Sequence, residues 1–322
     1  MKDISAMPKK EILTAIDKAR NILIVSHSRP DGDCLGAAFA MRRYCMHLGK
    51  IADIANDSPL PRAYEFIEGA EHYNKQNAEK YDLAIVVDCA TDTRYSISEQ
   101  YVKAAKCVIW IDHHMKDFGY GTINWVDEKA SSTCEMIYRL LCGVYIDKEI
   151  ANYLFIGLST DTGHFMHNNV NIGVLETAVE LVRLGADCSK LSASLYKSRT
   201  VEKTRLIAKA IDNLRFFEDG RICIVPLTSQ LLGSCNISSN DTEGIIDYAS
   251  AVIGVQVAVC MSEERPNVYK VSFRSRSENV AAVAETFGGG GHKYASGCQI
   301  CGHIEDVIQK IIRAVRLTLW TD

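Results

Sequence analysis

The sequence predicts an α/β fold. We expect an N-terminal, doubly wound, mostly parallel sheet with helices on both faces, then a helical connector and a smaller α+β domain. Two observations predict the first part. Short apolar runs alternate with helical patterns through the first half of the chain, as in doubly wound α/β domains. The runs are apolar at consecutive positions, which is expected of parallel strands that are covered on both faces.

The elements expected in the N-terminal half alternate between helix and strand. An amphipathic helix within residues 1–20 comes first. The predicted strands are "NILIVS" (21–26), "IADIAN" (51–56), "LAIVVD" (83–88) and "CVIWID" (107–112), and the predicted helices cover residues 35–48, 98–106, 132–141 and 148–159. Ligands of such a sheet are expected beyond the carboxyl ends of its strands.

From about residue 185 the pattern changes, and charged segments without strand patterns predict short helices. Two hairpins are expected further on, because "EDG" and "ERPN" provide turn residues between apolar runs. The expected elements are hairpins at 214–228 and 255–275, helices at 241–254, 278–287 and 303–319, and the stretch "GGGGHKYASG" at 288–297. The expected domains are residues 1–185 and 210–322, joined by a linker of residues 186–209.

The composition narrows the functional class. Hydrophobic residues make up 47% of the chain and charged residues 24%, as in ordinary globular proteins. No apolar run reaches the length of about 18 residues that a membrane span needs, and the N-terminus lacks the apolar segment of a signal peptide. The twelve cysteines are therefore expected to be reduced, which favours the cytoplasm. The net charge of -4 argues against coating of long nucleic acid.

Aspartate and histidine recur where the predicted strands end. Because a parallel sheet brings these ends to one edge, we expect the side chains to converge. The candidates are His27, Asp31 and Asp33 after the first strand, Asp88 at the third, Asp112, His113 and His114 at the fourth, and Asp161 after a later helix. We expect Gly32 to permit a sharp turn that presents both Asp31 and Asp33.

This donor set predicts a pair of divalent ions. Carboxylates and imidazoles without thiolates suit Mn²⁺ or Mg²⁺ better than structural zinc. The donors are too many for one ion and suit two ions about 3.5–4 Å apart, an arrangement that hydrolyses phosphate esters. Taken singly, each motif also fits an ordinary turn, a strand-end cap or a packed histidine. The coincidence of all of them at the ends of strands and helices favours the metal site.

The motifs "SHSRPDGD", "VVDCATDTR", "WIDHH" and "STDTGHF" occur in the order found in the DHH phosphoesterase superfamily, which this chain resembles over residues 12–319. Its C-terminal "FRS" and "GGGGHKYASG" resemble the DHH-associated domain. Length and C-terminal type are most similar to the nanoRNase and pAp phosphatase subfamily, where pAp is 3'-phosphoadenosine-5'-phosphate. Cys34 and His164 depart from the usual pattern. We expect Cys34 to be a buried, inert thiol, and oxidation or binding of the wrong metal is the competing interpretation. For His164, contact with substrate and simple packing are both open.

The resemblance implies a role for each candidate. His27, Asp31 and Asp88 would hold one Mn²⁺, with Mg²⁺ as the other choice, and Asp33, Asp88, His113 and Asp161 would hold the second. Asp112 would orient a histidine through its other ring nitrogen. His114 would contact the scissile phosphate and protonate the leaving alkoxide. Arg94 would support the loop that follows Asp88, or would contact the substrate. An ordinary surface arginine is an equal interpretation.

The glycine run predicts an anion-binding loop in the C-terminal domain. Four consecutive N–H groups at residues 288–291 could wrap an anion, and Arg274 offers a fork for phosphate. A flexible turn is the competing interpretation. The candidate substrate-binding residues are Arg94, Arg274, Ser275, Gly289, Gly290, Gly291, His292, Lys293 and Ser296.

The resemblance implies a cytoplasmic hydrolase that uses water activated by two metal ions. Its substrates would be short oligoribonucleotides, cut to nucleoside 5'-monophosphates, and pAp, cut to AMP and phosphate. Long nucleic acid and membranes are not expected partners, and a homodimer is left open. The main alternative is a phosphodiesterase for cyclic di-AMP or linear pApA. Polyphosphate or pyrophosphate hydrolysis ranks lower, as does a non-catalytic nucleotide sensor, which would require broken metal motifs.

Overall fold

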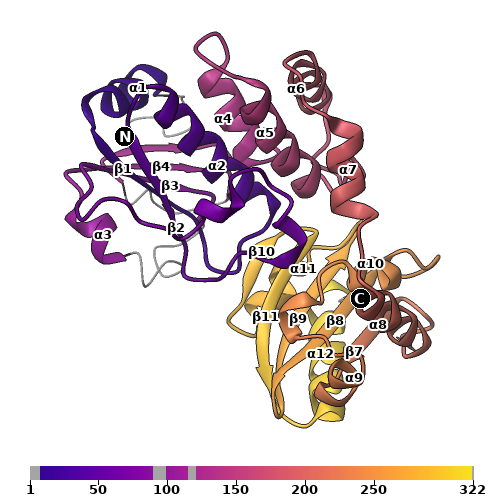
Figure 1. Cartoon of the computed structure of the whole chain (residues 1–322). Helices are drawn as coiled ribbons and strands as arrows, with labels where there is room; N and C mark the ends of the chain where they lie inside the picture. Colours follow the sequence, from indigo (N-terminus) through magenta and orange to yellow (C-terminus); the bar gives the residue numbers. More distant parts are fainter. Residues whose placement is uncertain (1–7, 90–98, 115–120, 321–322) are drawn as a thin grey trace. The chain divides into compact units, whose positions relative to one another are not determined.

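The computed structural model describes residues 8–89, 99–114 and 121–320 and divides the chain into two units, Met1–Ser198 and Arg199–Asp322 (Figure 1). The expected connector of residues 186–209 is shared between them. Helix α7 (Cys188–Tyr196) belongs to the first unit and helix α8 (Val201–Asp212) to the second. Among the described residues, no helix combines the length and the apolar character that crossing a bilayer requires.

The first unit contains a five-stranded sheet in the order β2-β1-β3-β4-β5, and every neighbouring pair is parallel. The four strands predicted in this region are confirmed to within a residue at each end. The fifth, β5, was not predicted because its four residues, "INWV", form too short a pattern. The strands are β1 (Asn21–Val25), β2 (Ile51–Ala55), β3 (Leu83–Val87), β4 (Cys107–Asp112) and β5 (Ile123–Val126).

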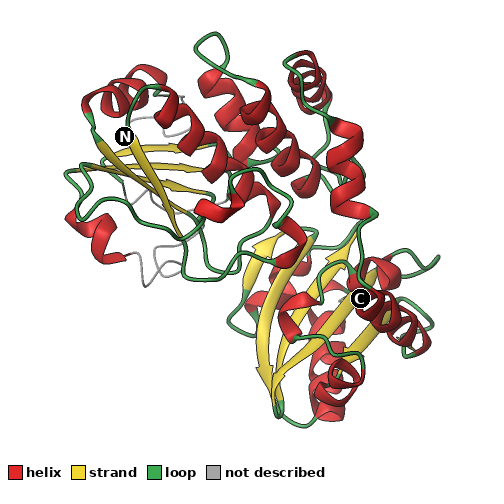
Figure 2. Ribbon diagram, in the orientation of Figure 1, coloured by secondary structure: helices red, strands yellow, loops and turns green. Residues whose placement is uncertain are grey.

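Both faces of this sheet are buried, as the continuous apolar runs predicted. Along β3, Ile85 and Val87 point to the face of the sheet where most of the helices complete the core. Ala84 and Val86 point to the other face, where they pack with Val102 of α3. Figure 2 shows the helices around the sheet. They are α1 (Lys9–Lys18), α2 (Gly32–His47), α3 (Glu99–Ala104), α4 (Thr133–Leu141), α5 (Lys148–Asp161) and α6 (Ile172–Arg183), with short 3₁₀ turns at Arg62–Tyr64 and Ala70–His72.

The second unit contains a six-stranded mixed sheet in the order β10-β11-β9-β8-β7-β6. Both predicted hairpins are confirmed as antiparallel pairs, β6 with β7 and β8 with β9. Helices α11 and α12 pack on one face, and α8 and α10 on the other. The remaining elements are β6 (Arg215–Phe217), β7 (Ile222–Leu227), α9 (Ser229–Ser234), α10 (Ile245–Ser250), β8 (Val257–Arg265), β9 (Val268–Ser275), α11 (Val280–Glu285), β10 (Gly290–His292), β11 (Ala295–Cys301) and α12 (Ile304–Leu319).

All twelve cysteines lie within the described residues, and each is a free thiol. One C-x-x-C spacing occurs, from Cys298 to Cys301, and it lies on strand β11. Residues three apart on a strand point to opposite faces, so these two thiols do not form the paired arrangement of a redox or zinc motif.

Candidate metal centre

The first unit brings the predicted aspartates and histidines to the carboxyl edge of its sheet. Strand β1 ends two residues before His27, β3 ends immediately before Asp88, and β4 ends at Asp112, with His113 and His114 directly after it. Strands β1, β3 and β4 are adjacent and parallel. Their carboxyl ends therefore share one edge, and the predicted convergence is confirmed.

Asp88 lies at the centre of this arrangement, with 1% of its surface exposed. Its Oδ2 is 3.6 Å from His27 Nε2, and its Oδ1 is 3.6 Å from His113 Nε2 and 3.4 Å from His114 Nδ1. Burial acts to raise the pKa of Asp88, but these three histidines lower it to about 2. The backbone of Asp88 has a φ of 51°, an uncommon conformation for a residue other than glycine. This conformation follows strand β3 directly, where the chain turns away from the sheet.

Asp31 and His27 form the first group with Asp88. His27 Nε2 is 3.7 Å from Asp31 Oδ2. Asp31 also caps helix α2, because its Oδ1 accepts the N–H groups of Asp33 and Cys34, each at 3.1 Å. The cap fixes the carboxylate with one oxygen on the helix and the other toward His27. One ligand atom each from His27, Asp31, Cys34 and Asp88 lies within 4.8 Å of the others.

The prediction of a sharp turn at Gly32 is wrong. Gly32 is the first residue of α2, which begins three residues before the predicted start. A Cβ at this position would overlap the side chain of Thr160 on helix α5. Glycine is therefore present because α5 approaches α2 closely, and the cap at Asp31 rather than a tight turn presents the two carboxylates.

Asp33 is held by the N-terminus of helix α4, which the sequence reasoning missed. Its Oδ2 accepts the N–H of Thr133 at 2.6 Å, and its Oδ1 accepts that of Cys134 at 2.9 Å. The Thr133 hydroxyl donates to Asp88 Oδ1 at 3.1 Å. Burial and the charges of the neighbouring carboxylates raise the pKa of Asp33. The sequence contained one sign that a helix begins here. In "SSTCE", Ser132 precedes the helix and a glutamate follows three residues later, as in a capping box.

His113 completes the second group. Its Nε2 is 3.4 Å from Asp161 Oδ2 and 3.9 Å from Asp33 Oδ2. Its Nδ1 lies 3.3 Å from the carbonyl oxygen of Ala130, so the ring is held from the other side. Asp161 is the last residue of α5. The structure therefore brings together the four residues of this group, which lie on α2, directly after β3, directly after β4 and on α5.

His114 is oriented by the fully buried Asp112. Asp112 Oδ1 is 2.8 Å from His114 Nδ1 and also accepts the backbone N–H of His114 at 3.1 Å. Burial acts to lower the pKa of His114, but Asp112 and Asp88 raise it above its ordinary value. The histidine that Asp112 orients is thus His114, which leaves Nε2 as the ring nitrogen directed away from this carboxylate.

These donors fit a pair of divalent ions. Asp88 belongs both to the group with His27 and Asp31 and to the group with Asp33 and His113. A carboxylate shared between two sets of oxygen and imidazole donors is the arrangement expected of a two-metal site. The residues present therefore suit the ions that the motifs predicted.

Comparison with known proteins assigns the family. The model of the DHH family N-terminal domain matches residues 21–158, and that of the DHHA1 domain matches residues 226–320. The bifunctional oligoribonuclease and PAP phosphatase NrnA of Thermus thermophilus is 31% identical over 310 residues, which cover 95% of this chain and 92% of that protein. The chain belongs to the DHH family.

Two further similarities extend over the length of this DHH protein. The Bacillus subtilis protein of the same name is 26% identical over 298 residues, covering 91% of this chain and 93% of that protein. The crystal structure of an exopolyphosphatase-related protein from Bacteroides fragilis has a TM-score of 0.88 at 24% identity, covering 96% of this chain and 95% of that one. The second similarity shows that the two proteins share a fold.

The DHHA1 part places the predicted substrate-binding residues on and around strands β9, β10 and β11. The expectation of four free glycine N–H groups is wrong. The N–H of Gly288 donates to Glu285 and that of Gly289 to Ala284, both at the C-terminus of α11. Gly290 and Gly291 lie in strand β10, opposite Gly297 and Ser296. The glycines therefore end a helix and begin a strand, and they do not form a four-residue nest.

Two of the predicted hydroxyl groups are used by the DHHA1 fold itself. Ser275 Oγ donates to the carbonyl of Gln256 at 2.6 Å, and Ser296 Oγ donates to that of Val280 at 2.7 Å. Arg274 donates to the carbonyl of Phe273 at 3.0 Å. His292 and Lys293 are exposed. Arg94 lies outside the described residues of this DHH protein.

His164 packs beside the end of α5. Its Nδ1 is 3.1 Å from Ser159 Oγ, which also lies 3.2 Å from the Tyr196 hydroxyl. The rings of His164 and Tyr196 have centroids 4.5 Å apart. This polar cluster was not predicted, because Ser159 and Tyr196 are far apart in the sequence.

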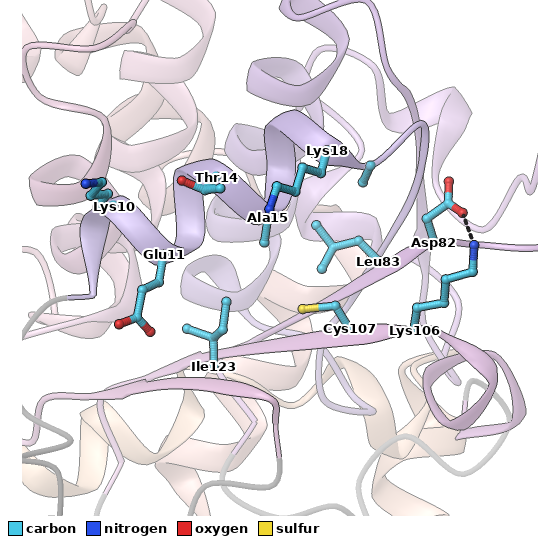
Figure 3. A pocket seen from close by; sticks show the side chains of 11 residues that line it. Lys10, Glu11, Thr14, Ala15, Lys18, Asp82, Leu83, Lys106, Cys107 and Ile123 are labelled. Carbon is cyan, nitrogen blue, oxygen red and sulfur yellow. Dashed lines mark hydrogen bonds and ion pairs between the residues drawn. The ribbon is translucent and has the colours of Figure 1, made fainter.

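A separate cavity of about 570 Å³ lies at the opposite edge of the parallel sheet (Figure 3). The first residues of β3, β4 and β5, namely Leu83, Cys107 and Ile123, line it together with helix α1. At its rim, Lys106 pairs with Asp82 at 3.5 Å. Since the metal ligands gather at the carboxyl ends of the strands, this cavity is not part of the candidate centre.

Proposed function

We propose that this DHH protein hydrolyses the phosphoester bond to a nucleoside 3'-oxygen. Its substrates are short oligoribonucleotides, which yield nucleoside 5'-monophosphates, and pAp, which yields AMP and phosphate. The same oxygen leaves in both reactions. The observation that carries the proposal is the complete donor set around the shared Asp88. Similarity to proteins named as oligoribonuclease and PAP phosphatase over more than nine-tenths of the chain supports the substrate class.

The proposed centre holds two divalent ions, for which we favour Mn²⁺ over Mg²⁺. His27, Asp31 and Asp88 would bind one ion, and Asp33, Asp88, His113 and Asp161 the other. When bound, such ions would stabilise charge on phosphoryl oxygens and lower the pKa of a water, so that it can lose a proton and attack phosphorus near neutral pH. The helix-capping contacts of Asp31 and the α4 contacts of Asp33 hold both carboxylates in place. The ligands are thus positioned before substrate arrives.

His114 is the proposed general acid. Asp112 holds Nδ1 at 2.8 Å, so that Nε2 presents a proton to the leaving 3'-oxygen. Burial acts to lower the pKa of His114, but Asp112 and Asp88 raise it above its ordinary value, which favours the protonated ring that a general acid requires. In this scheme Asp112 is a positioning residue, because it acts through His114.

The DHHA1 domain is the proposed binding site for the anionic end of the substrate. Arg274, Gly290, Gly291 and the exposed His292 and Lys293 remain candidates for this role. Ser275 Oγ donates to Gln256 and accepts the N–H groups of Ser277 and Glu278, and Ser296 Oγ donates to Val280, so neither hydroxyl has a proton to donate to an anion in this arrangement. The net charge of -4 favours short substrates over long nucleic acid, whose binding depends on many cationic contacts.

One assay series tests the proposal. The full chain with Mn²⁺ is offered pAp, 5'-labelled RNAs from a dinucleotide to long strands, pApA and cyclic di-AMP. We expect pAp and the shortest RNAs to turn over fastest. Fastest turnover of cyclic di-AMP would overturn the substrate assignment, and no turnover of any compound would overturn the catalytic one.

A matched pair of variants ties the activity to the centre. Asp88→Asn removes the shared charge at the carboxyl end of β3, and Asp82→Asn removes a charge just before the other end of the same strand. We expect Asp88→Asn to abolish turnover and Asp82→Asn to retain it. Equal activity of the two variants would show that the hydrolysis occurs elsewhere.

A further inference from the structure

Cys34 places a thiol among the ligands of the first proposed ion. It is fully buried and is the third residue of helix α2, directly after Asp33. Its Sγ and one ligand atom each of His27, Asp31 and Asp88 lie within 4.8 Å of one another. The sulfur is also 3.6 Å from the main-chain oxygen of Asp31. This position therefore offers nitrogen, oxygen and sulfur donors together.

The second proposed position has a different donor set. Asp33, Asp88 and His113 supply oxygen and nitrogen atoms, and Asp161 adds a further carboxylate 3.4 Å from His113 Nε2. Oxygen-rich sites suit Mn²⁺ and Mg²⁺, whereas thiolate ligands favour zinc and metals of similar softness. The two halves of the centre thus differ in their expected metal preference.

We propose that the sulfur of Cys34 is a fourth protein ligand of the ion held by His27, Asp31 and Asp88 when that ion accepts thiolate, as Zn²⁺ and Co²⁺ do. The proposal rests on the proposed function, in which this group binds a divalent ion. As the metal–sulfur bond forms, the S–H bond breaks and its proton passes to solvent, so that Cys34 adds one proton to those released when the ion binds. Four donors of this kind match the number that zinc takes in proteins.

Two other buried cysteines provide matched controls. Cys45 lies on the same helix as Cys34 and is equally buried. Cys134 lies on the other side of the centre, where its Sγ is 3.4 Å from the main-chain oxygen of Asp33. Neither belongs to a group of candidate ligand atoms in the described part of the chain. Replacing each of the three thiols therefore separates ligation by Cys34 from general loss of a buried thiol.

The test is a titration of the metal-stripped full chain with Co²⁺, followed by absorbance. The proteins compared are the wild type, Cys34→Ala, Cys34→Ser, Cys45→Ala and Cys134→Ala, each checked for its fold by circular dichroism. We expect a sulfur-to-cobalt charge-transfer band in the wild type and in the two control variants. The band should be lost from both Cys34 variants, while the visible d–d bands still report bound cobalt.

A second readout is affinity for each metal by calorimetry. We expect Cys34→Ser to weaken Zn²⁺ binding by about tenfold or more and to leave Mn²⁺ binding unchanged. The inference would be overturned if the wild type binds cobalt without the charge-transfer band. It would also be overturned if the band persists in Cys34→Ala. If Mn²⁺-dependent hydrolysis is present in that case, the proposed function stands. If neither Mn²⁺ nor Co²⁺ binds and nothing is hydrolysed, both fail.

Discussion

The three histidines around Asp88 supply the counter-charge for the crowded carboxylates of the centre. Asp88 and its neighbours are buried, where charges of like sign repel strongly. Burial acts to lower the pKa of all three histidines, but that of His27 is raised by the Cys34 sulfur and then by Asp31 and Asp88. The pKa values of His113 and His114 are raised by their adjacent carboxylates. In the metal-free protein the raised pKa values favour protons on these rings, and divalent ions would compete with the protons on the two proposed ligands, His27 and His113.

This exchange predicts how stability depends on pH. A histidine whose pKa is raised by folding stabilises the metal-free protein fully below about pH 6.5, and this contribution is lost as the pH rises through the higher folded value. Metal ligands must instead be deprotonated. We therefore expect the Tm of the chelator-treated protein to fall as the pH rises above about 6.5, while the increase in Tm on adding Mn²⁺ grows over the same range. Asp88, with its pKa of about 2, stays ionised throughout.

Differential scanning fluorimetry with Mn²⁺ or chelator checks this expectation. His72→Gln serves as a control, because His72 is an exposed histidine paired with Glu71. It should leave both pH profiles unchanged. A Mn²⁺-induced shift that shrinks as the pH rises would contradict the proton exchange.

His114 should be needed for the reaction but not for metal binding. Loss of a general acid costs about 10²–10⁴ in rate, so we expect His114→Gln to lower kcat by that factor with Mn²⁺ affinity unchanged. Asp112→Asn should cost about 10–100-fold, because it disturbs only the orientation of the ring. Steady-state kinetics and calorimetry measure the two properties. A Mn²⁺ affinity that falls in parallel with kcat would make His114 a ligand instead.

At the scale of elements, the approach of α5 to α2 and α4 brings Asp161 to the centre. Three glycines permit it. A Cβ at Gly32 would overlap Thr160, one at Gly36 would overlap the main-chain oxygen of Tyr153, and one at Gly157 would overlap the sulfur of Cys134 and lie 2.7 Å from Asp33 Oδ1. Helix separation is therefore set by positions that have no side chain.

Substituting Gly32 tests this packing. Gly32→Ala should destabilise the protein by about 1–3 kcal/mol, the usual cost of overpacking, and lower Mn²⁺ affinity because α5 must move. Gly233→Ala is the control, since nothing lies within 4 Å of a Cβ there and alanine favours a helix. Thermal unfolding and calorimetry measure the outcome. Equal Tm values for the two variants would show that α5 accommodates the methyl group without strain.

The elements also show what could be predicted from the sequence. Strands β1, β3 and β4 are apolar at almost every position, so their ends, and with them most of the centre, could be located. Strand β11 could not be predicted, because "ASGCQIC" contains small and polar residues. This segment is a strand because it pairs with β9 and β10. Helix α2 begins at Gly32 although glycine disfavours helices, because the cap at Asp31 outweighs that preference.

The contacts of Asp33 show the limit within the site. Its partners are the backbone N–H groups of Thr133 and Cys134, and a backbone group leaves no residue-type pattern in the sequence. For the glycine run 288–291, the prediction failed because the sequence suggested more than the structure contains. Four glycines suggested free N–H groups, but the structure uses the first two to end α11, a position that glycine commonly takes.

At the scale of the whole molecule, each unit has its own buried core. The first has cores on both faces of the parallel sheet, and the second has cores on both faces of the mixed sheet. Units with separate cores can fold alone. We expect the fragments 1–198 and 199–322 each to unfold cooperatively, and the first to bind Mn²⁺ with the affinity of the full chain. Circular dichroism and calorimetry check this, and an unfolded fragment would show that its core depends on the rest of the chain.

The glycines between α2, α4 and α5 have a consequence for how function is inferred from tolerance to mutation. In a library of all single substitutions selected for hydrolysis, Gly32, Gly36 and Gly157 should be as depleted as Asp88, although they bind nothing. Selection for soluble, folded protein would separate the two kinds of position. Variants that place a large side chain at these glycines should be depleted in it, whereas substitutions of the ligands should pass. Depletion alone would thus overcount the catalytic residues of this protein.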